Sequence, residues 1–184
     1  MAEHAGPVRV LIVGGSLGAL ALNEIVPRAL ALLAAGHALE IRHQAGRSKV
    51  EAAQGLYEEL GLQARVTEFL DDMAQAYSWA DLVICRAGAL TVSELAAAGV
   101  GSILVPYPFA VDDHQTRNAD YLVRGQAAVL MPQAQLDAAS LADKLTELLA
   151  EPGKLLALAR AARKLTMPDA ARLVADHCEQ VLLP

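Results

Sequence analysis

Short apolar runs alternate with amphipathic helical stretches along almost the whole chain. Strands are predicted at residues 8–13, 39–43, 65–67, 82–85, 102–105 and 127–130. Helices are predicted at residues 22–33, near 49–60 and 72–79, at 90–98, near 114–123, and at 136–149, 154–165 and 169–182. Strict alternation of this kind predicts a parallel sheet with helices on both faces. We therefore expect an α/β fold, a Rossmann-like parallel sheet of about six strands flanked by helices.

The unusual loops of the chain all follow predicted strands. Ligands of open parallel sheets bind at the carboxyl ends of the strands. Glycine, aromatic and polar residues gather at these ends, at Gly14-Gly15, His43-Gln44, Phe69-Leu70, Cys85–Ala89 and Pro106–Gln115. A ligand site is therefore expected along this one edge of the sheet.

The composition excludes several classes of protein. A chain of 184 residues favours one domain with its own core. Hydrophobic residues make up 54% of it, yet no apolar run approaches the roughly 18 residues of a membrane span. A net charge of −6 without a basic stripe argues against nucleic-acid binding. Cys85 and Cys178 form no metal or redox motif, so we expect both to be reduced core residues.

The segment Cys85–Glu94 carries the clearest chemical signal. A strand is expected to end at about Cys85, and a turn of small residues then leads to a helix N-terminus at Ala89–Thr91. Free backbone N–H groups at such a terminus bind phosphate. Glu94 lies roughly one turn further in, where its carboxylate can reach two hydroxyls of a sugar attached to that phosphate. The segment is therefore typical of a site for a sugar nucleotide.

Gly14-Gly15-Ser16-Leu17-Gly18 places glycines and a hydroxyl at the start of the first helix. Such a loop lets a diphosphate approach the backbone closely, but a tight strand–helix turn needs glycine equally often. The loop lacks the GxGxxG spacing, and no acidic residue ends the second strand, which argues against NAD. The GK[ST] ending of a P-loop is also missing.

Two acidic pairs, Asp71-Asp72 and Asp112-Asp113, precede predicted helices. Aspartate is a natural N-cap, so we interpret both pairs as caps rather than metal ligands. The histidines show no ligand spacing either, and we expect no metal and no other cofactor. The polar cluster Asp112–Asn118 is either a surface loop with a helix cap or a hydrogen-bonding site for a polyhydroxyl ligand, in which Gln115 offers both a donor and an acceptor.

Five segments, in this order, resemble the MurG family of bacterial glycosyltransferases: Val13–Ala19, Phe69–Met73, Cys85–Glu94, Glu94–Gly99 and Asp112–Asn118. The resemblance covers nearly the whole chain and corresponds to the C-terminal half of that family, whose members have the two-domain GT-B architecture. It implies binding of the donor UDP-GlcNAc for the inverting, metal-independent GlcNAc transfer that converts lipid I to lipid II in peptidoglycan synthesis. The general base is expected in the N-terminal half. No catalytic residue is therefore assigned here, and the chain alone is expected to be inactive.

The resemblance also assigns donor-binding roles to individual residues. Ser16, supported by Gly14 and Gly15, would approach the diphosphate. Residues 89–93 would supply the helix N-terminus for the phosphates, namely Ala89, Leu90, Thr91, Val92 and Ser93.

The same resemblance assigns the base and sugar contacts. Leu70 would lie against the uracil, and Glu94 would accept hydrogen bonds from the ribose hydroxyls. Gln115 would contact the GlcNAc hydroxyls. Some members of the family have a second glutamine where His114 stands, which makes His114 a supporting residue.

The expected organisation follows from this resemblance. Residues 1–7 are a lead, 8–166 the UDP-GlcNAc-binding domain, and 167–184 a helix that packs on the N-terminal domain. Expected partners are UDP-GlcNAc and the acceptor domain with lipid I, with no nucleic acid and no direct membrane insertion. The whole enzyme is expected in the cytoplasm, peripheral on the inner face of the plasma membrane. Two alternatives stay open: the donor subunit of a naturally split GT-B glycosyltransferase, and a non-catalytic nucleotide-sugar sensor.

Overall fold

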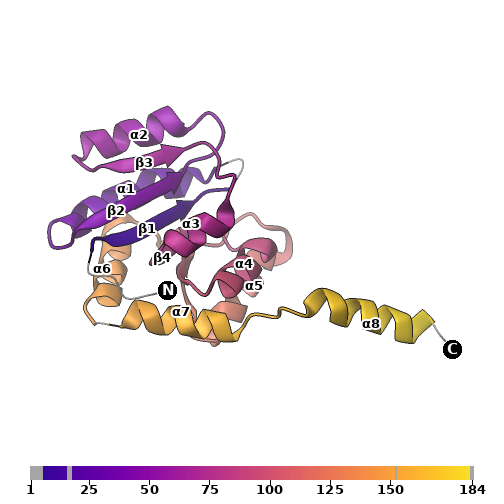
Figure 1. Ribbon diagram of the computed structural model, residues 1–184. Coiled ribbons are helices and arrows are strands. Elements are labelled where there is room, and N and C mark those ends of the chain that lie inside the picture. Colours follow the sequence, from indigo (N-terminus) through magenta and orange to yellow (C-terminus); the bar gives the residue numbers. More distant parts are fainter. Residues whose placement is uncertain (1–5, 16–17, 152, 183–184) are drawn as a thin grey trace.

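A parallel six-stranded sheet forms the centre of the molecule (Figure 1). The computed structural model describes residues 6–15, 18–151 and 153–182. Within them the strand order is β3-β2-β1-β4-β5-β6, and every neighbouring pair is parallel. The strands are β1 (Val8–Val13), β2 (Leu39–Gln44), β3 (Ala64–Thr67), β4 (Leu82–Cys85), β5 (Gly101–Leu104) and β6 (Ala128–Leu130). The predicted Rossmann-like fold is confirmed.

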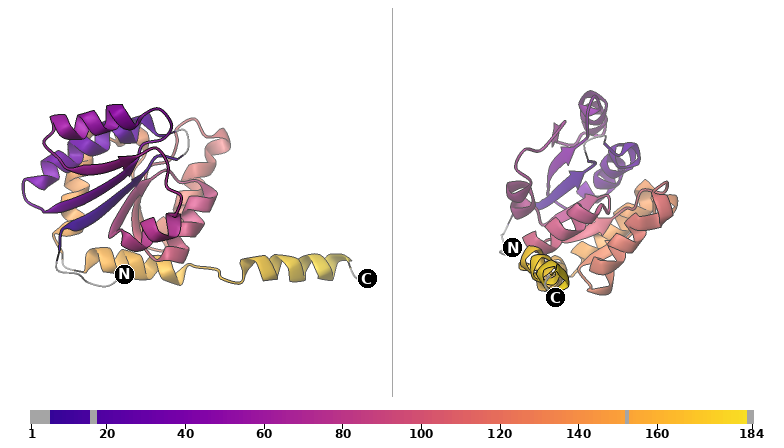
Figure 2. Two further views of the ribbon diagram at one scale, coloured as in Figure 1. Left: turned by 45° about the horizontal axis from the view of Figure 1, so that its top comes forward. Right: turned by 90° about the vertical axis from the view of Figure 1, so that its right-hand side faces the viewer.

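Helices cover both faces of this sheet, as the views in Figures 1 and 2 show. One buried cluster joins the sheet to α1, α2 and α6, and a second joins its other face to α3, α4 and α5. The helices are α1 (Leu20–Ala34), α2 (Val50–Glu59), α3 (Met73–Trp79), α4 (Ala89–Ala98), α5 (His114–Arg124), α6 (Ala138–Leu149), α7 (Lys154–Lys164) and α8 (Ala170–Leu182), with 3-10 turns η1 (Val111–Asp113) and η2 (Gln133–Gln135).

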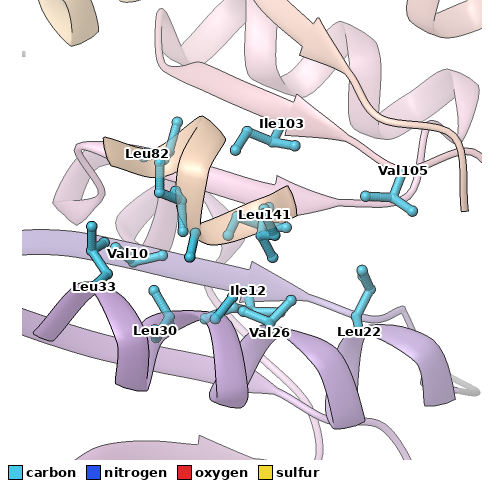
Figure 3. Packing of buried hydrophobic residues seen from close by; sticks show 14 of the residues in the cluster. Val10, Ile12, Leu22, Val26, Leu30, Leu33, Leu82, Ile103, Val105 and Leu141 are labelled. Carbon is cyan, nitrogen blue, oxygen red and sulfur yellow. The ribbon is translucent and has the colours of Figure 1, made fainter. Parts of the chain in front are cut away.

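The apolar runs form strands because the central strands are buried on both faces. In β1, Val10 and Ile12 face α1, while Leu11 between them belongs to the cluster on the opposite side of the sheet. Figure 3 shows the side of Val10 and Ile12, where Leu22, Val26, Leu30 and Leu33 of α1 lie against the sheet. Such two-sided burial selects continuous apolar runs over alternating patterns.

Local caps move some boundaries from their predicted positions. The sixth helix was expected from residue 136, but α6 begins at Ala138 after the turn η2. The cause is a capping box: Asp137 accepts from the Ser140 N–H at 2.8 Å, and Ser140 Oγ accepts from the Asp137 N–H at 3.1 Å. Strand β4 lies at the predicted residues 82–85.

Helix α8 lies apart from the rest of the molecule, beyond the end of α7 (Figures 1 and 2). Leu173, Val174 and Val181 on this helix are exposed. Cys178 is also exposed, so the expectation that both cysteines are core residues holds only for Cys85. None of the helices in the described residues combines the length and apolarity that crossing a membrane requires.

Two serines should respond oppositely to the same substitution. Ser102 in β5 is fully buried, and its hydroxyl has no hydrogen-bond partner among the described residues. Ser102→Ala removes a buried unsatisfied group and should raise the free energy of unfolding by about 1 kcal/mol. Ser140→Ala breaks the capping box of α6 and should lower it by about 1 kcal/mol. Urea unfolding measures both, and destabilisation by Ser102→Ala would contradict this description of the β5 environment.

Candidate functional site

The order of the strands creates a topological switch point between β1 and β4. These two strands are neighbours, with Val13 paired to Cys85, but their following helices α1 and α4 belong to opposite faces of the sheet. The loops after β1 and β4 therefore leave the same point of the sheet edge in different directions. Ligands of open parallel sheets bind at such a switch point.

The N-terminus of α4 opens into this edge without a cap. Gly88 is the N-cap residue and has no side chain to accept from the first turn, and no other side chain caps it among the described residues. The first turn contains Ala89, Leu90 and Thr91, and Leu90 is 80% exposed. Unsatisfied N–H groups and the positive end of the helix dipole make this terminus suited to an anion.

The predicted phosphate segment 89–93 divides into two parts. The Val92 N–H already donates to the Gly88 carbonyl at 3.0 Å, and its side chain is buried in the core. The Ser93 hydroxyl donates to the Ala89 carbonyl at 3.1 Å. The backbone donors that α4 can offer a ligand are thus those of Ala89, Leu90 and Thr91, a narrower set than the sequence indicated.

Glu94 is exposed on α4, and a buried tyrosine holds its side chain. The Tyr77 hydroxyl of α3 donates to Glu94 Oε2 at 3.0 Å. Burial raises the pKa of Tyr77, with contributions from Cys85 and Glu94, so the phenol remains a donor. Burial, with the nearby Glu94 charge, raises the pKa of the Cys85 thiol to about 12, which leaves it unreactive. The Glu94 carboxylate keeps an oxygen for a ligand hydroxyl.

Helix α1, which follows the glycine loop after β1, likewise starts without a side-chain cap from any residue that the structure describes. Ala19 is the N-cap of α1 and provides no side-chain oxygen. Gly18 adopts φ +68°, and a Cβ at this position would stand 2.1 Å from the Ala45 carbonyl oxygen. Only glycine permits this approach between the two loops. Ser16, predicted to approach a diphosphate, and Leu17 lie outside the described residues.

The side chain of Gln115 is partly committed to the protein. Its Oε1 accepts from the Tyr107 N–H at 2.9 Å and from the Ala87 N–H at 3.3 Å. The sequence suggested that Gln115 offers both a donor and an acceptor, but the acceptor is occupied by these two backbone groups. A ligand would meet the amide nitrogen as a donor. The Asn118 amide donates to the Ala87 carbonyl at 3.1 Å, so α5 holds the loop after β4 from two residues.

The two acidic pairs behave differently. Asp72 caps α3 as predicted, accepting from the Gln75 N–H at 2.8 Å. Asp113 occupies the N-cap of α5 but makes no capping bond to the backbone, so that interpretation is wrong for this pair. Its φ of 51° turns the carboxylate toward the Thr116 hydroxyl, which donates to Oδ1 at 2.6 Å. Neighbouring His114, the predicted supporting residue, is exposed.

The loop between β3 and α3 borders a small cavity. Leu70 is half-buried and packs against the second core cluster, whereas Phe69 beside it is 61% exposed. The cavity measures about 260 Å³, and its lining includes Arg42, Arg65 and Asp71. An exposed aromatic ring next to half-buried Leu70 provides a flat apolar surface at this end of the sheet edge.

Arg86 is a functional candidate that the sequence analysis did not identify. Its Nη1 donates to the Val105 and Pro106 carbonyls at 3.1 and 3.0 Å, and Nη2 donates to Gln133 Oε1 at 2.6 Å. Burial lowers its pKa from the ordinary value, yet a guanidinium stays protonated in proteins. All these partners are neutral, so a positive charge remains at the loop after β4. The sequence offered one indication of this role, because Arg86 lies inside the segment Cys85–Glu94.

A series of buried side chains, linked by hydrogen bonds, supports the glycine loop. Asn23 Nδ2 donates to the Ala45 carbonyl at 3.0 Å, so its Oδ1 faces His43 Nε2 as an acceptor at 3.1 Å. His43 Nε2 therefore carries the proton, and Nδ1 accepts from the Tyr57 hydroxyl at 3.0 Å. Burial lowers the pKa of His43 to about 4. A neutral histidine thus fixes the position of Ala45, against which Gly18 packs.

The described residues contain no group of three or more histidine, cysteine, aspartate or glutamate side chains that could hold a metal ion. The groups that the described residues bring to this edge include backbone N–H groups, the Glu94 carboxylate, the Gln115 amide and the Arg86 charge. These groups fit an anionic ligand that carries hydroxyls.

Comparisons with known proteins agree with this geometry. Residues 9–174 match the family described as "Glycosyltransferase family 28 C-terminal domain". Two relatives, from Stutzerimonas stutzeri and Marinobacter nauticus, are named UDP-N-acetylglucosamine–N-acetylmuramyl-(pentapeptide) pyrophosphoryl-undecaprenol N-acetylglucosamine transferase. They are 57% and 53% identical over 97% of this chain, which covers 50% and 49% of their lengths. The chain thus spans about half of these relatives.

Solved structures give the same picture. The crystal structure of Acinetobacter baumannii MurG superimposes with a TM-score of 0.90 at 46% identity, covering 97% of this chain and 51% of that one. The fold is also shared with the spinosyn forosaminyltransferase SpnP, at a TM-score of 0.67 and 20% identity. The resemblance inferred from five sequence segments is confirmed.

His43 should make stability depend on pH below neutrality. Its pKa is about 4 in the folded chain and 6.5 when unfolded, so only the unfolded chain takes up this proton between those values. The free energy of unfolding should therefore fall by roughly 3 kcal/mol from this group as pH drops from 6.5 to 4. His43→Leu, although less stable at pH 7, lacks that contribution. Urea unfolding at pH 7 and pH 4 should show the gap between wild type and variant closing by this amount, and a constant gap would contradict a neutral His43.

Proposed function

The chain belongs to the family of glycosyltransferase family 28 C-terminal domains, and we propose that it is the donor-binding half of a MurG-type enzyme, holding UDP-N-acetylglucosamine at the carboxyl edge of its sheet. The observation that carries the proposal is the pair of uncapped helix N-termini at the switch point between β1 and β4. Glu94 lies in the second turn of one of these helices. Donor groups for a diphosphate and a carboxylate for a sugar therefore stand side by side.

The proposed donor lies along the edge from β3 to β5. The uracil rests near Phe69 and Leu70, and Glu94 accepts hydrogen bonds from the ribose. The diphosphate meets the N-terminus of α4 and the glycine loop with Ser16. The GlcNAc extends toward the Gln115 amide nitrogen, which has no partner among the described residues.

The proposed contribution to the reaction is stabilisation of the leaving group. The 4-hydroxyl of the MurNAc in lipid I attacks the anomeric carbon of GlcNAc, its configuration inverts, and UDP leaves. Negative charge builds up on the diphosphate in the transition state. Preorganised N–H groups and the positive end of the α4 dipole stabilise that charge without metal ions. Arg86 adds a positive charge at the same loop.

The remainder of the longer protein supplies the acceptor site in this proposal, with lipid I as the second substrate at the inner face of the plasma membrane. Helix α8 carries Leu173, Val174 and Val181 as exposed apolar residues. Helical geometry places them within a single broad face. We propose that this face packs on the acceptor half, because burial against another element stabilises an apolar helix face.

The ribose assignment predicts a loss of affinity in Glu94→Ala. Charge-assisted hydrogen bonds contribute roughly 1.5–3 kcal/mol each, so affinity for UDP should fall about tenfold to a hundredfold. Tyr77→Phe, which only releases the carboxylate, should weaken binding by less than Glu94→Ala. Calorimetric titration with UDP in the presence of a chelator measures both effects.

Glu59→Ala is the matched control, because Glu59 is an exposed glutamate at the end of α2, away from the site. It should leave the affinity unchanged. Equal UDP affinity in wild type and Glu94→Ala would disprove the ribose contact. An absolute requirement for magnesium or manganese would bring Asp71, Asp72, Asp112 and Asp113 back as candidate ligands.

The chain alone is expected to bind the donor without transferring its sugar. The residues that resemble those of the family all concern the donor, and positioning of two substrates contributes several kcal/mol to catalysis. Purified chain incubated with UDP-GlcNAc and lipid I should give no lipid II above the uncatalysed background. Sustained lipid II formation would mean that a complete active site lies within these residues.

A further inference from the structure

Gln44, the last residue of β2, has a buried side chain whose amide is fully hydrogen-bonded. Its Oε1 accepts from the Gly15 N–H at 2.8 Å. Its Nε2 donates to the Gly15 carbonyl at 2.9 Å and to the Glu68 carbonyl at 2.8 Å. The side chain is therefore bound to the backbone of two different loops.

These two loops stand on opposite sides of β2. Strand β2 lies between β1 and β3, Gly15 follows β1, and Glu68 follows β3 just before Phe69. The backbone pairing of β2 with β1 ends where the Gly14 N–H donates to the Gln44 carbonyl at 3.0 Å. Beyond that point the side chain of Gln44 takes over and joins the loops that the sheet no longer connects.

Among the side chains of similar size, only glutamine can make these three hydrogen bonds to Gly15 and Glu68. Gly15 has φ +82° and presents both its N–H and its carbonyl to one side-chain amide. An ionised glutamate could accept from Gly15 but could not donate to the two carbonyls. Leucine would fill a similar volume but would remove all three hydrogen bonds to the loops, leaving the Gly15 carbonyl only its bond from the Gly18 N–H at 2.8 Å. Asparagine is shorter by one methylene and could not span both loops.

We propose that Gln44 is a positioning residue that sets the spacing between the diphosphate end and the base end of the nucleotide site. The proposal rests on the proposed function, which places the diphosphate at the glycine loop and the uracil by Phe69. Gln44 touches neither. It holds the two loops in one arrangement, so that a ligand contacting both needs no further ordering of the chain.

A positioning role for Gln44 predicts that the loss of affinity in its variants depends on the length of the ligand. Uridine contacts only the base and ribose end, whereas UDP spans both loops. Loss of the Gln44 hydrogen bonds should therefore lower the affinity for UDP more than the affinity for uridine. General destabilisation of the fold would change the affinities of both ligands in parallel.

The experiment compares uridine and UDP binding in wild type, Gln44→Leu and Gln44→Glu. Calorimetry or NMR titration should show the ratio of UDP affinity to uridine affinity falling about tenfold in both variants, since several neutral hydrogen bonds are lost. Amide hydrogen exchange at Gly15 should accelerate in Gln44→Leu and less in Gln44→Glu, which retains the acceptor. Gln63→Leu, which replaces an exposed glutamine outside the site, is the matched control and should change neither quantity.

The outcomes separate this proposal from the function on which it rests. Absence of UDP binding in the wild type would overturn the proposed function and the positioning role together. Wild-type binding with an unchanged UDP-to-uridine ratio in the variants would overturn the positioning role alone. Failure of both variants to fold, with Gln63→Leu native, would assign Gln44 to fold stability and would also overturn it.

Discussion

Helix N-termini without caps are the constraint on which the site depends. An α-helix leaves its first N–H groups without internal partners, and a side-chain oxygen normally satisfies one of them. Helix α6 follows this rule with Asp137, and α3 follows it with Asp72. Helices α1 and α4 start instead after Ala19 and Gly88 without a side-chain cap from the described residues, as α2, α5 and α7 also do, and what distinguishes α1 and α4 is that they follow neighbouring strands. The adjacency of β1 and β4 brings these two starts to one point of the sheet edge, so N–H groups left unsatisfied by the fold gather where a ligand can use them.

A layer of buried polar side chains converts this arrangement into a fixed geometry. A buried polar group must find partners: Gln44 and Asn23 bond backbone atoms of the neighbouring loops, and His43 holds the Asn23 side chain in place. Each such bond removes a direction in which a loop could move. The residues at the C-terminal end of β2 therefore position the glycine loop at two points, Ala45 and Gly15.

Much of the fold was predictable because two-sided burial leaves a strong pattern. Strand β4 lies at the predicted residues, and the Cys85–Glu94 segment forms the predicted strand, turn and helix start. The roles of single polar side chains were less predictable, because they depend on partners far apart in sequence. Gln115 meets Ala87 and Tyr107 across two loops, and Asp113 turns toward Thr116 rather than capping α5. Periodicity carries no information about such contacts.

Net charge is a poor guide to what this edge can bind. The chain carries −6 overall, and Glu94 adds a negative charge beside the proposed diphosphate site. Surface charges further away than about 8–10 Å are largely screened at physiological ionic strength. Directed N–H groups act at contact distance, where each bond to a charged oxygen contributes roughly 1.5–3 kcal/mol. The helix start of α4 and the Arg86 guanidinium therefore decide the sign of the local interaction. The same reasoning explains why Glu94 is compatible with a phosphate ligand: Tyr77 holds the carboxylate on the second turn of α4, where hydroxyl groups rather than phosphate oxygens would meet it.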